Sequence, residues 1–460
     1  MSVRQRSARA PGEADKPGVL EYGYWLFLVL AVGRLGQLVP ALGAIPAVKL
    51  VMGVTIAAIF VSWRRLPRVA VPAAAMRKNA LLLVAIAVVL TPFSFWRGAS
   101  REFVLQELPV LAAGTCSAYF MARSWRSLRG SFLALVLCGA ILAVSAISGY
   151  KGGRAATDTM YDPNDLAYLL VTVFPLAMAF FFTARGVKAK LMYGGIGAVL
   201  LLAILLTQSR GGLLGLITVV LAMALVPMKA NWTTRKDGRR RRSHNALAML
   251  LVAVCMATVV WSVLPDAARA RFGTLLHISQ DYNMKADDIT GRGSIWKRGV
   301  TAALERPVGY GPNSFGMVDF RFGGKMKAPH NSFLQVLVEL GFLGALLFLR
   351  MYYLALLELH RARRRLATLD SMDEQQEQLV VFARALQFAL LGNAVAGFFL
   401  SMAYAIPLWV LFGTVMAVTA IIDQTVRKKA SSAVQQPHWF RPRVAGAAAV
   451  LRGRQGGYSR

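Results

Sequence analysis

Long apolar segments alternate with short polar ones along most of this chain. The apolar blocks recur at about 20 residues, the length that an α-helix needs to cross a bilayer. Two of the clearest are NALLLVAIAVVL and GGIGAVLLLAILL. The pattern predicts twelve spans, at about 22–40, 44–63, 79–96, 103–122, 130–149, 165–184, 191–208, 211–228, 246–264, 332–357, 378–401 and 405–423. We therefore expect an all-α, polytopic membrane helical bundle.

The predicted spans divide the chain into five parts. An N-terminal tail covers residues 1–21, spans one to nine cover 22–264, and spans ten to twelve cover 332–423. A long loop, 265–331, separates spans nine and ten, and a basic tail follows at 424–460. We interpret the first span as a retained anchor and not as a cleaved signal peptide.

Composition agrees with a membrane protein. Hydrophobic residues make up 56% of the chain and charged residues 16%, against about 45–50% and about 25% in soluble domains. This excludes a soluble enzyme. A disulfide scaffold is excluded as well. Cys116, Cys138 and Cys255 all lie in apolar stretches and are expected to be small core residues.

The formal net charge of +31 fits either nucleic-acid binding or the basic cytoplasmic loops of membrane proteins. The distribution of charge separates the two. With the N-terminus inside, 34 of the 53 Lys and Arg residues lie in the inner connections and tails, and 15 lie outside. The run Arg239–Arg242 is then a positive-inside anchor that also attracts anionic lipid head groups. We expect both termini in the cytoplasm and no nucleic-acid partner.

The outer loop carries its own local structure. The piece GSIWKRGVTAALE predicts a helix that ends before Arg306-Pro307 and the glycine-rich turn VGYGPNSFG. A long ordered loop in a compact protein is usually functional. A second outer segment, YKGGRAATDTMYDPNDLAYLL, places Asp162 before Pro163, as at a helix N-cap. In a third, TQSRGGLLGL, the glycines after Arg210 allow a tight hairpin between spans seven and eight.

The positions of the histidines narrow the choice of a candidate catalytic residue. Of the five histidines, only His277 and His330 face outward in this topology. His330 begins span ten, where it is either a structural hydrogen-bonding group or a general base. Arg210, at a membrane boundary, either extends its guanidinium to lipid phosphate or belongs to a binding site.

Several signatures are missing from the sequence. It has no GxxxxGK[ST] loop, no HExxH, no Cys/His cluster and no paired-carboxylate motif on the outer side. We therefore expect no nucleotide site, no metal and no cofactor. Intramembrane acids are scarce, and we expect Glu339 to be a buried partner for an intramembrane arginine such as Arg384.

Four outer motifs in order resemble the O-antigen ligase and O-antigen polymerase superfamily. They are YDPNDLAYLLVTVFPLA, SRGGLLGL, GRGSIWKRGVTAALERPVGYGPNSFG and HNSFLQVLVELGFLGALLF. The resemblance covers roughly 140–345 by motif. It implies an all-helical fold of the C-type glycosyltransferase kind and metal-independent glycan transfer at the periplasmic face of a bacterial inner membrane. The implied donor is a glycan on undecaprenyl diphosphate. The implied acceptor is lipid A–core for a ligase, a lipid-linked glycan for a polymerase, or protein Ser or Thr in a related branch.

The resemblance also implies roles for individual residues. His330 is the expected catalytic base, while Arg210, Arg292 and, on a weaker match, Arg154 are expected to bind the donor diphosphate. Possible supporting residues are Ser209, Lys297, Arg298 and Asn331. Arginine suits the role because its planar guanidinium binds phosphate oxygens in pairs and stays charged.

A transporter or flippase of lipid-linked glycan is the alternative from another class. It would explain the bundle and a basic outer cavity, but not the long outer loop that ends in HNS. Transporters of this kind often contain internal repeats, and the two halves of this chain show none.

Overall fold

The computed structural model describes residues 19–34, 73–120, 124–157, 161–226, 264–273, 289–369 and 371–435, with isolated positions between these ranges. All regular elements in the described ranges are helical. In chain order they are α1 (Val19–Ala31), α5 (Ala74–Leu90), η2 (Thr91–Phe93), α6 (Arg97–Glu102), η3 (Phe103–Glu107), α7 (Leu108–Phe120), α8 (Trp125–Ser148), α9 (Pro163–Thr183), α10 (Val187–Leu206), α11 (Arg210–Leu225), α13 (Asp266–Gly273), α14 (Arg292–Glu305), α15 (Phe315–Arg321), α16 (Ser332–Leu366), α17 (Glu374–Gly397) and α18 (Ile406–Gln435).

Seven helical segments in the described ranges are long and apolar enough to cross a membrane. They are Ala74–Phe93, Trp125–Ser148, Pro163–Thr183, Val187–Leu206, Ser332–Leu366, Glu374–Gly397 and Ile406–Ser431, and Arg210–Leu225 is a shorter apolar helix. The prediction of an all-helical membrane bundle is thus confirmed. The total of twelve stays a prediction. The predicted span 44–63 lies almost entirely outside the described residues, as does 246–264.

Two helices continue well past the predicted ends of their spans. Helix α16 runs to Leu366 and α18 to Gln435, where the apolar pattern ended at 357 and 423. The extra part of α16, about two and a half turns at residues 358–366, has the sequence ELHRARRRL. Arginine and lysine end an apolar run but are good helix formers, so the helix outlasts the hydrophobic signal.

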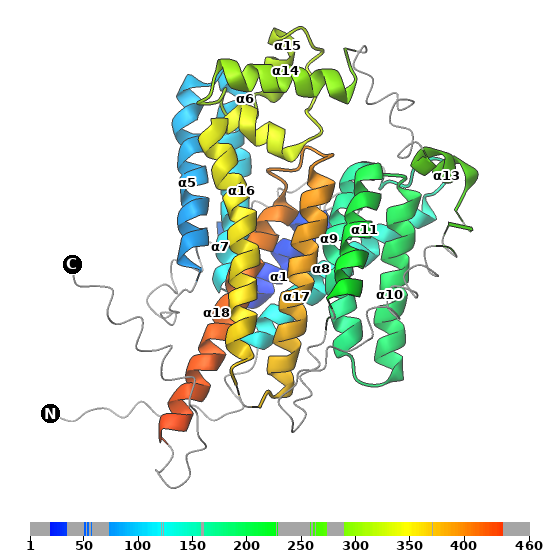
Figure 1. The fold of residues 1–460 in the computed structure, drawn as a ribbon, viewed down its shortest axis with the longest axis vertical. Coiled ribbons are helices and arrows are strands. Elements are labelled where there is room, and N and C mark those ends of the chain that lie inside the picture. The colour runs from blue at the N-terminus through cyan, green and yellow to red at the C-terminus, as the bar shows by residue number, and fades with distance from the viewer. Residues whose placement is uncertain are drawn as a thin grey trace, which may run out of the picture.

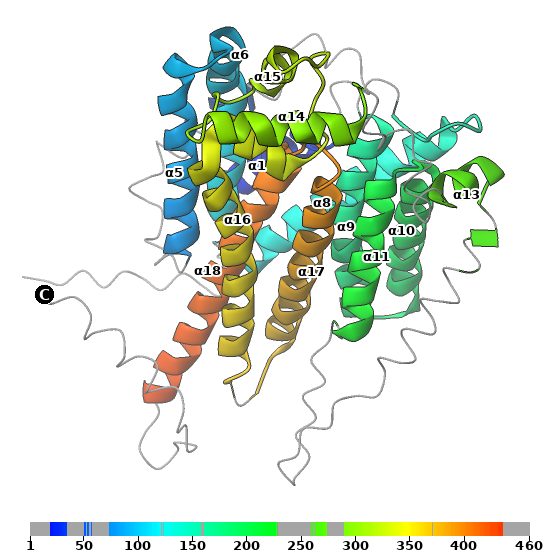
Figure 2. The ribbon, with the colours of Figure 1, turned by 45° about the horizontal axis from the view of Figure 1, so that its top comes forward.

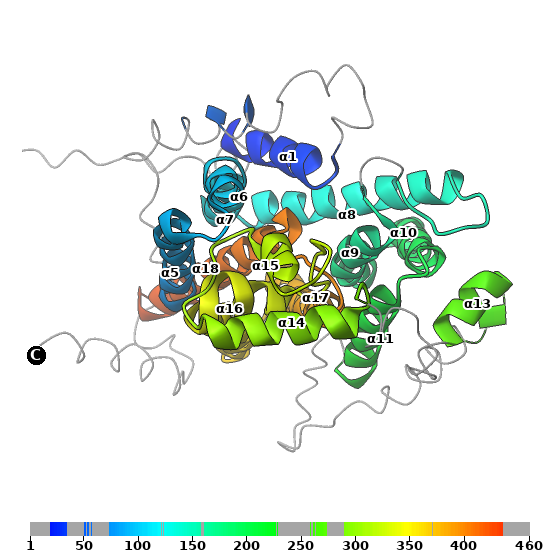
Figure 3. The same cartoon turned by 90° about the horizontal axis from the view of Figure 1, so that it is seen from above.

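The centre of the bundle is formed by α9, α17 and α18, seen from above in Figure 3. Helix α17 packs on α9 and α11, and α18 packs on α7 and α16. A buried polar cluster joins three of these helices. The amide of Asn393 on α17 accepts from the hydroxyls of Tyr168 (2.9 Å) and Tyr352 (2.8 Å) and donates to Thr172 (3.0 Å). All four polar groups are therefore paired in an apolar interior, which fixes one packing arrangement.

Helices α6, α14 and α15 lie at one end of the bundle, the upper end of Figure 1, and the views of Figures 1 and 2 agree on this. The segments predicted to face outward meet there. Phe95 N donates to Tyr310 O (2.8 Å), Arg154 Nε to Thr207 O (3.0 Å) and Arg271 Nε to Gln208 O (3.1 Å).

The segments predicted to face inward meet at the lower end. Arg185 pairs with Glu374 (2.6 Å), and Gln424 Nε2 donates to Ala122 O (3.3 Å). The described connections that carry these residues therefore share one end of the bundle. The side of the membrane on which this end lies stays a prediction.

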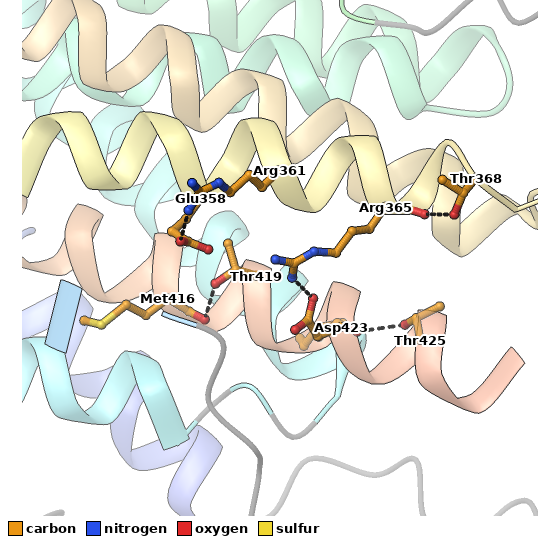
Figure 4. Close-up of polar contacts among 9 residues, drawn as sticks. Glu358, Arg361, Arg365, Thr368, Met416, Thr419, Asp423 and Thr425 are labelled. Carbon is orange, nitrogen blue, oxygen red and sulfur yellow. Dashed lines mark hydrogen bonds and ion pairs between the residues drawn. The ribbon is translucent and has the colours of Figure 1, made fainter. Parts of the chain in front are cut away.

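Figure 4 shows the polar contacts between α16 and α18 near this lower end. Arg365 forms an ion pair with Asp423 across the two helices. Glu358 pairs with Arg361 within α16 (3.2 Å). Asp423 is only 8% exposed, so the pair links the extended ends of both helices below the apolar core.

Candidate active site

The segment Pro329–Asn331, which leads into α16, is held at three successive residues. Pro329 O accepts from the indole N–H of Trp296 on α14 (2.8 Å). The backbone N–H of His330 donates to Ser401 Oγ (2.8 Å). The side chain of Asn331 caps α16 by accepting from the first backbone amides of that helix, at 2.9 and 3.0 Å. Asn331, predicted as a supporting residue, thus acts as a helix cap.

The next residue, Ser332, ties the same point to the connection between α17 and α18. Its hydroxyl donates to Leu400 O (2.6 Å) and accepts from Met402 N (2.8 Å). The start of α16 is therefore fixed to both α14 and residues 400–402.

His330 has a left-handed backbone, with φ +46°. This region is unfavourable for residues with a Cβ and persists only where the surroundings hold it. Here the hydrogen bonds on either side of the residue hold it. Such strained positions concentrate at functional sites, which makes this one a candidate.

The surroundings of His330 favour the neutral imidazole. Burial lowers its pKa below the ordinary value of 6.5, and the positive charges of Arg292 and Lys327 lower it further. The carboxylate of Asp162 acts in the opposite direction. A neutral imidazole has one nitrogen free to accept a proton, so His330 has the form that a general base needs.

A buried ion pair orders the chain just before His330. Arg298 Nε donates to Asp319 Oδ1 (2.7 Å), and their side chains are 14% and 0% exposed. The other carboxylate oxygen accepts from Lys327 N (3.1 Å). Arg298, predicted as a supporting residue, thus shapes the loop through Asp319. Lys297, its neighbour in sequence, is exposed on α14.

The turn before Arg210 is a second fixed point at the upper end. Ser209 caps α11 by accepting from Gly212 N (3.2 Å), so this predicted supporting residue is also a cap. Arg154 donates to Thr207 O (3.0 Å) and, through Nη2, to Asn164 Oδ1 (2.7 Å). The predicted hairpin is confirmed: α10 ends at Leu206 and α11 begins at Arg210.

The Arg210 turn and the His330 segment meet the same short connection. A Cβ on Gly211 would lie 2.8 Å from Phe399 Cβ, so α11 begins in close contact with the end of α17. Two residues further along, Ser401 binds the N–H of His330. The segments that carry Arg210 and His330 therefore both lie against residues 396–402.

Asp162 has the predicted capping role, because its Oδ1 accepts from Asn164 N (2.6 Å) and Asp165 N (3.0 Å). Its charge also acts on His330, which the sequence did not indicate. Three further residues of this region were not predicted from the sequence: Trp296, Asp319 and Ser401. The tryptophan lies inside the GSIW motif and so carried a usable signal. The other two lie in segments without one.

The predicted pairing of Glu339 with Arg384 is wrong. Glu339 Oε2 accepts from Asn313 N (2.9 Å) and Oε1 from Phe315 N (3.2 Å). Helix α16 breaks at Gly341, and the chain around Tyr310 inserts beside the break. Backbone amides just before and at the start of α15 therefore bind the Glu339 carboxylate in place of the expected arginine.

Comparison with known protein families finds a match in this part of the chain. The model of the O-antigen ligase family matches residues 195–349. The match runs from within α10 to within α16, so it contains Arg210, Arg292 and His330, while Arg154 lies before it. No curated protein matches the chain. Residues 195–349 are therefore similar to the O-antigen ligase family, and this match supports the resemblance to the O-antigen ligase and polymerase superfamily that the sequence motifs indicated.

Proposed function

We propose that this protein is an O-antigen ligase-like transferase. It moves a glycan from undecaprenyl diphosphate to a hydroxyl of lipid A–core at the periplasmic face of a bacterial inner membrane. The proposal rests most on His330: a half-buried, left-handed histidine with a lowered pKa, within electrostatic reach of Arg292, inside the matched family segment. In this orientation the upper end of the bundle faces the periplasm and the lower end the cytoplasm.

The reaction is a direct displacement that inverts the anomeric centre. The acceptor oxygen attacks the anomeric carbon as the bond to the diphosphate oxygen breaks. His330 takes the proton of the acceptor hydroxyl, and the electron pair of the broken bond stays on the lipid diphosphate. General-base assistance of this kind contributes about 10²–10⁴ in rate. The proton then passes from His330 to water.

Negative charge grows on the leaving diphosphate. Arg210 begins α11, so the positive end of that helix adds to its guanidinium. Arg292 is likewise the first residue of its helix, α14. The N-cap residue of α14, Gly291, provides no side-chain cap. Arg154 holds the turn before Arg210 and would add a third positive charge. Removing one phosphate-binding arginine should cost about 10²–10³ in rate, by analogy with single oxyanion donors.

Reconstitution tests the proposal. Purified protein is mixed with undecaprenyl-diphosphate-linked glycan and lipid A–core, and the products are resolved by size. The tested variants are His330→Ala, Arg210→Ala and Arg292→Ala. Lys325→Ala is the control, because Lys325 is exposed in the same loop. We expect glycan on lipid A–core with wild type and the control, and almost none with the three variants.

The same experiment separates the alternatives. A ladder of longer lipid-linked chains, formed without lipid A–core, would make the protein a polymerase, and glycan on a protein acceptor would place it in the protein-glycosylating branch. Movement of the donor across vesicles without any product would make it a transporter. Full activity of His330→Ala would contradict the assignment of His330 as the general base.

A further inference from the structure

A cavity of about 760 Å³ lies at the lower end of the bundle, away from His330. The first turns of α8, α10 and α17 surround it together with the second half of α18. Ligand pockets in proteins typically measure about 300–1,000 Å³, so this one has room for more than a single small ion.

Positive side chains outnumber negative ones in its lining. Arg126, Arg129, Arg185 and Lys428 line the cavity, and Glu374 is the one carboxylate among the described residues that do so. Arg185 pairs with Glu374 at 2.6 Å, but their side chains are 78% and 45% exposed, so water screens this pair. The guanidinium of Arg129 lies 5.4 Å from the ring centre of Phe180, which orients it. The cavity therefore favours an anion.

The backbone adds to this preference. Helices α8 and α10 begin at the cavity, and the N-terminus of each carries a partial positive charge. Helix α17 also begins there, but Asp373, Glu374 and Glu377 at its start offset the positive charge of its N-terminus. The N-cap residue of α10 is Gly186, so no side chain at that position accepts a hydrogen bond from the first amides of the helix. Phosphate oxygens are common partners of such amides.

Apolar groups complete the lining. Met192 both lines the cavity and is 53% exposed on the surface of α10, next to Leu191, which is 70% exposed. Trp125 also lines it, and its indole N–H donates to Gln378 Oε1 (3.2 Å). Tryptophan with one polar contact and an apolar ring is typical of the membrane–water boundary. The cavity thus offers an anion site beside a surface suited to acyl chains.

We propose that this cavity binds the phosphate head group of an anionic phospholipid, with its acyl chains leaving past Met192. Basic pockets between membrane helices on the cytoplasmic side are suited to such head groups. The site lies at the opposite end of the bundle from His330 and does not depend on the transfer reaction. Bound lipid would link α8, α10, α17 and α18, whose ends surround it.

Native mass spectrometry of the purified full chain tests this directly. Affinity is measured for phosphatidylglycerol, phosphatidylcholine and inorganic phosphate. The test variant is Arg126→Gln/Lys428→Gln. The matched control is Lys188→Gln/Arg427→Gln, which removes the same charge from exposed positions at the same end that do not line the cavity.

We expect wild type to prefer phosphatidylglycerol. Each cation near an anionic lipid contributes about fivefold in affinity, so the test variant should bind it roughly 25-fold more weakly. The control should stay within about twofold of wild type. If the double variant does not fold, Lys428→Gln alone should show about a fivefold loss.

Two results would overturn the proposal. One is unchanged affinity for phosphatidylglycerol in the test variant. The other is binding of inorganic phosphate as tight as that of the lipid, which would make the cavity a site for a soluble phosphate.

Discussion

The backbone N–H of His330 donates a 2.8 Å hydrogen bond to the hydroxyl of Ser401, although 71 positions separate the two residues. This contact holds a left-handed residue at the start of α16 against the connection between α17 and α18. Ser401 therefore sets the position of the proposed base without taking part in the chemistry itself.

Replacing Ser401 with alanine should reduce the rate of glycan transfer by roughly tenfold, the effect of losing one hydrogen bond of about 1.4 kcal/mol. Ser401→Thr keeps the hydroxyl and should restore most of the rate. The two variants are compared under saturating donor and acceptor. Equal rates for alanine and wild type would show that the contact does not position His330.

The pH profile of the reaction should reflect the lowered pKa of His330. The neutral imidazole is the active form, so activity is lost as pH falls through this pKa, which lies below 6.5. Arg292→Gln removes a positive charge that lowers the pKa, so the acid limb should move to higher pH. Asp162→Asn removes the opposing negative charge and should move it lower. Profiles of kcat/KM for the three proteins provide the measurement, and an unmoved limb in both variants would contradict the role of His330.

Breaking the buried pair of Arg298 and Asp319 should lower the local stability of the fold by about 3–5 kcal/mol, because one charge is left buried without its partner. Asp319→Asn should therefore loosen the loop before His330 and lower activity. The exposed pair of Arg321 and Glu305, at 45% and 46% exposure, offers a matched control. Glu305→Gln should cost no more than about 1 kcal/mol. Hydrogen exchange of residues 322–331 with the activity assay distinguishes the two variants.

The contact between α11 and α17 depends on glycine. A Cβ on Gly215 would lie 2.8 Å from Gly392 O, too close for the helices to keep their separation. Gly215→Ala should lower the thermal unfolding temperature in detergent. Gly195→Ala on α10 is the control, since nothing lies within 4 Å of its Cβ position. Similar unfolding temperatures for the two variants would argue against close packing at Gly215.

The sequence predicted those parts of the fold that depend on local patterns. Apolar blocks located the seven membrane-length helices of the described ranges, and the Asp162-Pro163 pair located the start of α9. The ends of α16 and α18 were missed because arginine and lysine interrupt an apolar run without interrupting a helix. Local pattern therefore predicts where a helix exists better than where it ends.

Partners distant in sequence could not be predicted in the same way. The family resemblance suggested His330 as a candidate, but not its bond to Ser401, because no motif surrounds that serine. Arg298 was predicted as a possible supporting residue, but its bond to Asp319, 21 positions further along the chain, was not predicted. The partners of Glu339 are backbone amides, which no pattern of side chains reveals.

The break in α16 divides the helix into a part that packs with the outer loop and a part that packs in the bundle. Gly341 has φ +71°, and a Cβ there would lie 2.4 Å from Pro307 O. On its N-terminal side, Val338 O and Glu339 O accept from Tyr310 and Gly311, so this part of α16 is built into the outer loop. On its C-terminal side the helix packs in the bundle. Substitutions before Gly341 should therefore change mainly the transfer rate, whereas those after it should change mainly the stability of the membrane domain.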